Sequence, residues 1–291
     1  MQGTTSRTQT QLELEIENIG AHLNAYTARE QTVYYARCFK QDASTCVGII
    51  ADILQNSKFE DSAIEREREV ILREQEEVDK QFEEVVFDHL HATAYPGQPL
   101  GRTILGPKEN ILSIKRNDLV DYIGKNYRAD RMVLVSAGGV PHEEMVKLAE
   151  QYFGKVPPTG SYTPLGDAQK AKPRFVGSEV RIRDDTMQHA HIALAIEGVG
   201  HKDPDYWTML VMQAIVGNWD RALGGAPHLG SRLSSIVAKN GLANSFMSFS
   251  TSYSDTGLWG IYLVTENRIQ IDDLVHFCLR VCAKLWSLLI F

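Results

Sequence analysis

Cysteine is scarce in this chain of 291 residues, and no C-x-x-C pair occurs. The four cysteines are Cys38, Cys46, Cys278 and Cys282. So few cysteines exclude a disulfide scaffold and agree with free thiols in a reducing or matrix-type compartment. A run of about 20 apolar residues, the length of a membrane-spanning helix, is also missing. The apolar C-terminal stretch 274–291 contains His276, Arg280 and Lys284, so we expect no membrane span.

An excess of positive charge is absent too, and this argues against nucleic acid as a partner. The net charge is −7, and no domain-wide basic field exists. Most of the negative charge is local, because residues 65–88 carry ten acidic and four basic side chains. Such a patch attracts a basic partner. The hydrophobic share of 43% is ordinary for a globular protein with a sizeable core.

The zinc-protease motifs H-E-x-x-H and H-x-x-E-H do not occur around any of the nine histidines. Two histidine pairs have members two residues apart, His89 with His91 and His189 with His191. On a strand each pair would share a face. Two ligands are fewer than zinc usually takes from a protein, so we expect neither pair to be a metal site.

Hydrophobic periodicity predicts helices and strands mixed along the whole chain. For residues 11–19 a helix is preferred, although their apolar and acidic residues alternate as in a strand. Strands are expected over 21–27, 31–39, 131–137, 175–182, 189–198, 243–252 and 257–265. Helices are expected over 43–55, from Ser62 to Leu90, over 117–127, 141–154, 203–217 and 231–239, and after Asp272.

A segment rich in proline and glycine, residues 155–172, is the best linker in the chain. Helix and strand units lie on both sides of it. We therefore expect an N-terminal domain over residues 1–154 and a partial C-terminal domain over residues 173–291.

The long helix expected from Ser62 to Leu90 carries a one-sided acidic stripe. Its members are Glu67, Glu74, Glu77, Glu84 and Asp88. On one continuous helix these carboxylates would lie within a sector of roughly 100° and would repel one another. The stripe suggests a site for a cation, either a metal ion or an arginine side chain. The alternative is a solvated acidic face that Arg66, Arg68 and Arg73 partly neutralise.

Six runs of sequence carry a resemblance to a known family. They are GAHLNAYTAREQTVYYAR (20–37), IEREREVILREQEEV (64–78), EEVVFDHLHATAY (83–95), LGRTILGP (100–107), GNWDRALGG (217–225) and SFSTSYSDTGLWG (248–260). These runs resemble the beta subunits of mitochondrial processing peptidases, within the pitrilysin-type zinc metalloproteases, and the similarity is collinear over about residues 3–275. The resemblance implies an α+β metallohydrolase fold with two homologous α/β sandwich domains, both incomplete here.

The resemblance also implies an activity. The family consists of zinc endopeptidases that remove N-terminal presequences from precursors imported into the mitochondrial matrix, and the beta subunit pairs with an alpha subunit. Zinc is held by the two histidines of H-x-x-E-H and a distant glutamate, and the glutamate of the motif serves as general base. Gly3-Thr4 resembles a pair just downstream of that motif. We therefore expect the chain to start after the metal helix, to hold no zinc alone and to be catalytically incompetent.

Four carboxylates of the stripe match functional positions of the family. Glu74 matches the distant zinc ligand, and Glu67 matches an acid that supports this ligand. Glu84 and Asp88 match positions that bind arginine near the cleavage site of basic presequences.

The run AHLNAYT resembles the family's edge strand, to which substrate adds as an extra strand. Asn24, Ala25 and Tyr26 would form its centre, and an ordinary edge strand is the alternative. A second role remains open for the whole chain, because structural core proteins of the cytochrome bc complex share the fold. Partnership with cytochrome bc subunits is therefore an alternative to partnership with an alpha subunit, and a non-functional fragment is a third possibility.

Overall fold

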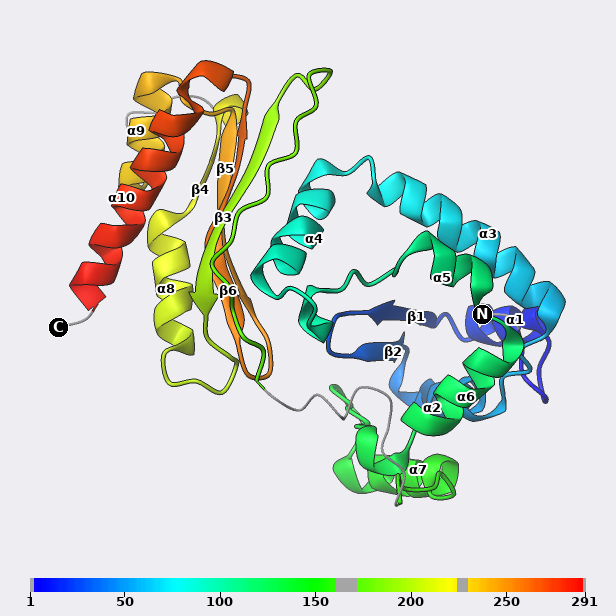
Figure 1. Ribbon diagram of the computed structural model, residues 1–291. Coiled ribbons are helices and arrows are strands. Elements are labelled where there is room, and N and C mark those ends of the chain that lie inside the picture. The colour runs from blue at the N-terminus through cyan, green and yellow to red at the C-terminus, as the bar shows by residue number, and fades with distance from the viewer. Residues whose placement is uncertain (1–2, 161–171, 224–229, 290–291) are drawn as a thin grey trace. The chain divides into compact units, whose positions relative to one another are not determined.

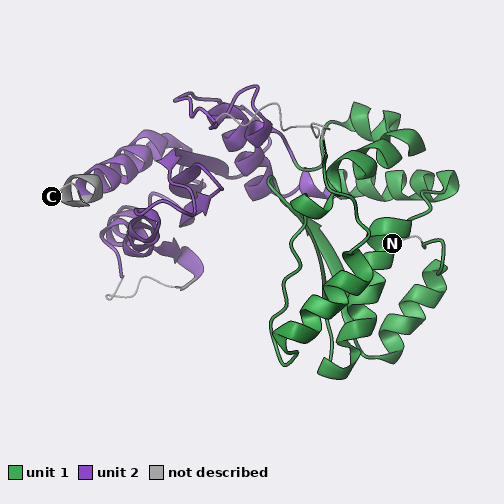
Figure 2. Ribbon diagram, turned by 90° about the horizontal axis from the view of Figure 1, so that it is seen from below, with its two compact units in different colours: residues 1–75, 104–170 green, residues 76–103, 171–291 purple. Residues whose placement is uncertain are grey.

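The computed structural model describes residues 3–160, 172–223 and 230–289. The chain forms two compact units, residues 1–75 with 104–170 and residues 76–103 with 171–291 (Figure 2). Helices and strands are mixed in each unit, which confirms the predicted class (Figure 1). The predicted linker falls mostly on residues 161–171, which lie outside the described residues. In the described stretches, no helix has both the length and the apolar character needed to cross a bilayer.

The first unit holds a two-stranded sheet and several helices. Its elements are α1 (Gln9–Asn18), β1 (His22–Thr27), β2 (Thr32–Arg37), η1 (Lys40–Asp42), α2 (Ala43–Asn56), most of α3 (Asp61–Val78), α5 (Lys108–Ser113), α6 (Arg116–Asn126), η3 (Ala129–Arg131) and α7 (His142–Phe153). The helix preferred over 11–19 is confirmed, and a capping box between Thr8 and Gln11 starts it. Leu12 and Ile16 of α1 pack with Ile49 of α2 in a small buried cluster.

The second unit is built on a four-stranded antiparallel sheet of order β3-β6-β5-β4. The strands are β3 (Ala190–Gly198), β4 (Asn218–Asp220), β5 (Ser245–Ser252) and β6 (Gly257–Thr265). Three helices cover one face: α8 (Tyr206–Val216), α9 (Arg232–Asn240) and α10 (Ile271–Leu289) (Figure 1). The other face carries α4 (Phe82–Ala94) (Figure 1). The short turns η2 (Pro99–Gly101), η5 (Arg221–Leu223) and η6 (Arg268–Gln270) complete the unit.

Strand β6 is buried on both faces, and its alternation separates two cores. Trp259 and Ile261 join the cluster beneath α8, α9 and α10. Leu258 and Tyr262 join the cluster beneath α4. Gly260 lies where a Cβ atom would stand only 2.0 Å from the Leu194 carbonyl oxygen, so the close approach of β3 and β6 requires glycine here.

The prediction of one helix from Ser62 to Leu90 is wrong. Helix α3 ends at Val78, and α4 begins at Phe82. Between them the Gln81 amide bonds the Val78 carbonyl, and Gln81 has an extended backbone with φ −92 and ψ 90. The acidic stripe is therefore divided between two helices, and its helical phase does not continue across residues 79–81.

Two predicted strands are also wrong. Residues 131–137 form no strand, and Val133 and Val135 are 86% and 79% exposed. Residues 175–182 form none either, although the Val176 amide bonds the Ala94 carbonyl at 2.9 Å. Both segments have apolar side chains suited to a strand, but neither finds a ladder partner among the described residues. Neither a helix nor a strand is expected over the glycine-rich residues 218–230, but they contain the short strand β4.

Candidate substrate and metal site

Helix α3 presents Glu67 and Glu74 on one side, because seven residues turn an α-helix to within about 20° of two full turns. On the neighbouring face of α3, the Arg68 guanidinium donates hydrogen bonds to the Ile111 and Ile114 carbonyls and so attaches α3 to the segment that contains α5. Gln75 adds a bond of 3.1 Å to the Gly106 carbonyl. Glu67 and Glu74 are both exposed. These contacts fix the rotation of α3 and keep both carboxylates in solvent.

The carboxylate of Glu74 makes no hydrogen bond or ion pair within the described part of the chain. A zinc ion usually takes three or four ligands from a protein, and Glu74 would supply one. No group of three or more histidine, cysteine, aspartate or glutamate side chains in the described ranges could hold a metal. The residues present therefore do not fit zinc by themselves.

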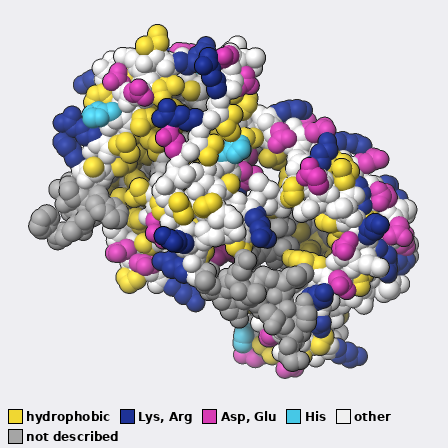
Figure 3. Space-filling view, in the orientation of Figure 1, with side chains coloured by type: hydrophobic (Ala, Val, Ile, Leu, Met, Phe, Trp, Pro, Cys, Tyr) yellow, Lys and Arg dark blue, Asp and Glu magenta, His cyan; other side chains and the backbone are white. Residues whose placement is uncertain are grey.

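Helix α4 presents Glu84 and Asp88 one turn apart. Glu84 is exposed and Asp88 is half-buried. The helix contains no lysine or arginine, whereas α3 mixes its acids with Arg66, Arg68 and Arg73. In the space-filling view, acidic and basic side chains accordingly alternate over the region of α3 (Figure 3). Within its own helix, therefore, the α4 pair has no lysine or arginine neighbour of the kind that α3 supplies to its acids.

Strand β1 carries the predicted substrate-binding backbone. It pairs with β2 in an antiparallel register that sets Asn24 opposite Tyr35 and Tyr26 opposite Val33. In the described residues β1 has no other strand neighbour, so it is an edge strand. Tyr26 is 51% exposed. The Asn24 Oδ1 atom accepts a bond of 2.8 Å from the Ala25 amide, so its side chain is folded back onto its own strand.

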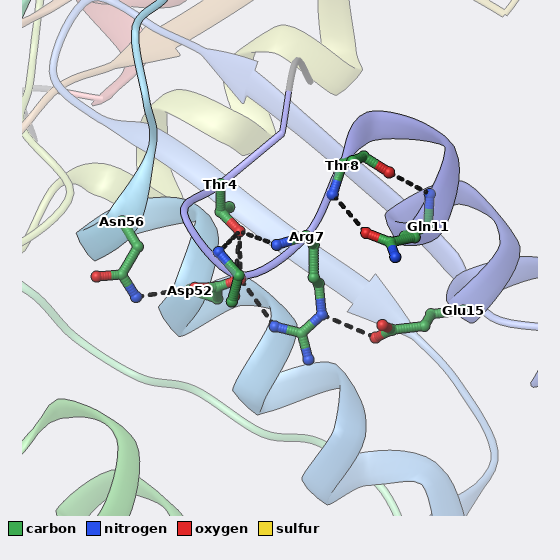
Figure 4. Close-up of polar contacts among 8 residues, drawn as sticks. Thr4, Arg7, Thr8, Gln11, Glu15, Asp52 and Asn56 are labelled. Atoms are coloured by element: carbon green, nitrogen blue, oxygen red, sulfur yellow. Dashed lines mark hydrogen bonds and ion pairs between the residues drawn. The ribbon is translucent and has the colours of Figure 1, made fainter.

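A buried carboxylate that sequence reasoning missed ties the first residues of the chain to α2. Asp52 accepts hydrogen bonds from Thr4 Oγ1 at 2.6 Å, Ser6 Oγ at 2.7 Å, Arg7 Nη1 at 2.7 Å and Asn56 Nδ2 at 2.8 Å (Figure 4). Burial acts to raise the pKa of Asp52, but the bonds from Thr4, Ser6, Asn56 and Arg7 outweigh it and lower the pKa to about 2. A sequence signal existed, because Asp52 stands beside the apolar positions of the helix predicted over 43–55.

Two family descriptions match the chain. "Insulinase (Peptidase family M16)" matches residues 1–108, and "Peptidase M16 inactive domain" matches residues 113–287. The chain belongs to the M16 peptidase family. Every predicted site residue of this M16 chain lies within the first match, which runs from residue 1 to residue 108.

The M16 chain is similar to curated relatives called mitochondrial-processing peptidase subunit beta. It is 66% identical over 285 residues to that of Neurospora crassa, covering 98% of this chain and 60% of the relative. With Saccharomyces cerevisiae the identity is 57%, covering 98% of this chain and 62% of the relative. With the relative from Homo sapiens the identity is 52%, covering 97% of this chain and 58% of the relative. The chain therefore spans about three-fifths of the length of these relatives.

A solved structure is also similar to this M16 chain. A chain of complex III2 from Candida albicans with Inz-5 bound superposes with a TM-score of 0.76 at 25% sequence identity. The superposition covers 90% of this chain and 62% of that chain. This likeness supports the predicted fold type.

Proposed function

We propose that this M16 chain is part of the beta subunit of a mitochondrial processing peptidase. The whole enzyme would be a zinc-dependent endopeptidase that removes N-terminal presequences in the mitochondrial matrix, together with an alpha subunit. One observation carries the proposal: α4 presents Glu84 and Asp88 one turn apart without a lysine or arginine in the helix. The 66% identity to the relative from Neurospora crassa supports the beta subunit of the processing peptidase as the group within the M16 family.

Glu84 and Asp88 would bind an arginine of a basic presequence. A guanidinium carries five donors in a rigid fork and can bond two carboxylates at once, whereas an ammonium acts as a point charge. The exposed edge of β1 at Asn24, Ala25 and Tyr26 would add the extended peptide as a further strand. The α4 pair would favour a basic segment, and the edge of β1 would favour an extended one.

Glu74 would contribute one zinc ligand in the complete protein, with Glu67 as the supporting acid. The chain itself would neither hold zinc tightly nor cleave peptides, because H-x-x-E-H is absent from its 291 residues. Zinc analysis and a peptide cleavage assay on the purified chain would measure both properties. Stoichiometric zinc together with cleavage beside a presequence arginine would contradict this part of the proposal.

The arginine-binding role is tested with a synthetic basic presequence peptide and the purified chain. The double variant Glu84→Gln/Asp88→Asn should weaken binding at least tenfold, because charge-assisted bonds are worth about 1.5–3 kcal/mol. A matched control is Glu13→Gln/Glu17→Gln, which removes two exposed acids at the same spacing from α1. It should change binding less than twofold, and equal losses in the two double variants would contradict the proposal.

A second candidate function is that of a structural core protein in a cytochrome bc complex. The superposition on a chain of complex III2 favours it. Affinity purification of the chain from mitochondria distinguishes the two roles. Recovery of cytochrome subunits without an alpha subunit would favour the core protein, and the reverse would favour the peptidase.

A further inference from the structure

The inner face of α4 is mainly apolar, which by itself would leave the rotation of the helix loosely fixed. Val86, Phe87, Leu90 and Ala94 belong to the cluster on the sheet of the second unit. The Phe87 ring lies 4.8 Å from that of Phe249. Apolar contacts are non-directional, so such a face tolerates small rotations and shifts. Directional contacts are needed to set where the outer side chains point.

One directional contact lies at the C-terminal end of α4. His91 is only 3% exposed, and its Nδ1 donates to the Phe87 carbonyl at 2.7 Å. Since a carbonyl cannot donate, this bond fixes the ring and places the proton on Nδ1. In the neutral imidazole Nε2 accepts from the Tyr253 hydroxyl at 2.6 Å. The end of the helix is thereby tied to the residue that follows β5.

A second histidine and tyrosine pair lies beneath the N-terminal end. The Tyr262 hydroxyl of β6 and His191 Nδ1 of β3 are hydrogen-bonded at 2.7 Å. The Phe82 ring of α4 stands 4.9 Å from the His191 ring, and Phe87 stands 5.8 Å from Tyr262. Burial, and then the charge of His189, lower the pKa of His191, so the imidazole stays neutral beneath Phe82. The first turn of α4 thus rests on a hydrogen-bonded aromatic pair.

Glu84 and Asp88 lie between these two contacts along α4. The ends of helical side chains stand about 5–6 Å from the axis, so a rotation of roughly 20° would move a carboxylate by about 2 Å. Bonds between guanidinium and carboxylate are about 2.7–2.9 Å long and directional. Such a displacement would break a two-point grip on arginine, but it would change the attraction of a lysine much less.

We propose that Tyr253 and Tyr262 are positioning residues, which hold α4 in the rotation that lets Glu84 and Asp88 grip an arginine. The inference rests on the proposed function, since it concerns the same arginine site. Tyr253 acts through His91 at one end of the helix, and Tyr262 acts with His191 at the other. Neither tyrosine needs to touch the peptide.

The test compares two basic peptides that differ at a single position, arginine in one and lysine in the other. Affinities are measured by calorimetric titration of the full chain. The unmodified protein should prefer the arginine peptide about tenfold, as expected for one charge-assisted bond. Tyr253→Phe and Tyr262→Phe should each bring the ratio of affinities below about threefold, while lysine-peptide affinity changes less than twofold. Tyr127→Phe, which removes a partly buried hydroxyl bonded at 3.0 Å to Tyr34, should leave the ratio unchanged.

The outcomes separate the two proposals. If Glu84→Gln/Asp88→Asn abolishes the arginine preference but both tyrosine variants keep it, the positioning role is wrong and the proposed function stands. A tyrosine variant that weakens both peptides equally shows a purely structural role and also overturns the inference. If the unmodified protein has no preference for arginine, the proposed function itself fails.

Discussion

Neutralising Asp52 is expected to release the first residues of the chain from α2. The Asp52 Oδ2 atom accepts from Thr4, Ser6 and Arg7, and the side chain is only 8% exposed. The difference between a pKa of about 2 and the ordinary 3.8 corresponds to about 2 kcal/mol of folding stability at neutral pH. In Asp52→Asn the Arg7 guanidinium loses this partner but keeps Glu15 at 2.9 Å. We expect the variant to lose about 2–3 kcal/mol, below the usual cost of a fully buried pair.

The stability that Asp52 contributes should disappear at acid pH. Because folding lowers the pKa of Asp52, its contribution is complete above the ordinary value of 3.8 and is lost as pH falls toward 2. The difference in unfolding free energy between the protein and Asp52→Asn should therefore shrink to under about 1 kcal/mol at pH 2.5. Other carboxylates titrate equally in both proteins and cancel in the difference.

Urea denaturation at pH 7 and pH 2.5 measures this difference. The matched control is Glu15→Gln, which removes the 41% exposed partner of Arg7 and should cost under about 1 kcal/mol. Equal stability of Asp52→Asn and the unmodified protein at pH 7 would show that the Asp52 carboxylate does not stabilise the fold. An undiminished difference at pH 2.5 would show that the loss of stability does not come from the carboxylate charge.

Three further predictions concern packing and metal binding. Arg68→Met should lower the urea stability of the protein by about 2 kcal/mol, because the Ile111 and Ile114 carbonyls lose their donor. The control Arg73→Met changes a 74% exposed side chain and should alter urea stability by under about 0.5 kcal/mol. Gly260→Ala should lower the free energy of thermal unfolding by at least about 3 kcal/mol, because the new Cβ would meet the Leu194 carbonyl. The control Gly124→Ala places a Cβ in open space on α6 and should stabilise the protein by about 0.5–1 kcal/mol. Zinc titration should give the same weak affinity for the chain and for Glu74→Gln, and a clear loss in Glu74→Gln would show a zinc site that the described residues do not form.

The sequence alone predicted elements whose signals are local. Apolar residues on one face predict the helix over 43–55, and mainly apolar runs of strand length predict the strands at 189–198 and 257–265. Residues 131–137 were misjudged for a physical reason. Valine and leucine favour a strand, but a strand also needs a partner for its backbone, and periodicity does not report one.

The break between α3 and α4 had no local signal either. Residues 76–84 contain no glycine or proline and are mostly good helix formers, so propensity predicts continuity. Tertiary packing decides otherwise, because α4 buries Phe87 and His91 against its sheet while α3 is held by Arg68 and Gln75. Spacing therefore predicted correctly which acids share a side within each helix, but not across residues 79–81. The two tyrosines under α4, one just after β5 and one in β6, lie far along the chain from it, so no sequence pattern revealed them.

Photo-crosslinking shows directly whether the carboxylates of α4 contact an arginine of a basic peptide. A photoreactive group is placed next to the arginine of a presequence peptide, and the crosslinked residues of the chain are identified by mass spectrometry. If the α4 carboxylates bind this arginine, crosslinks should fall within residues 82–94, and an excess of unlabelled arginine peptide should remove them. Competed crosslinks confined to other segments, with none in α4, would show that the arginine binds elsewhere.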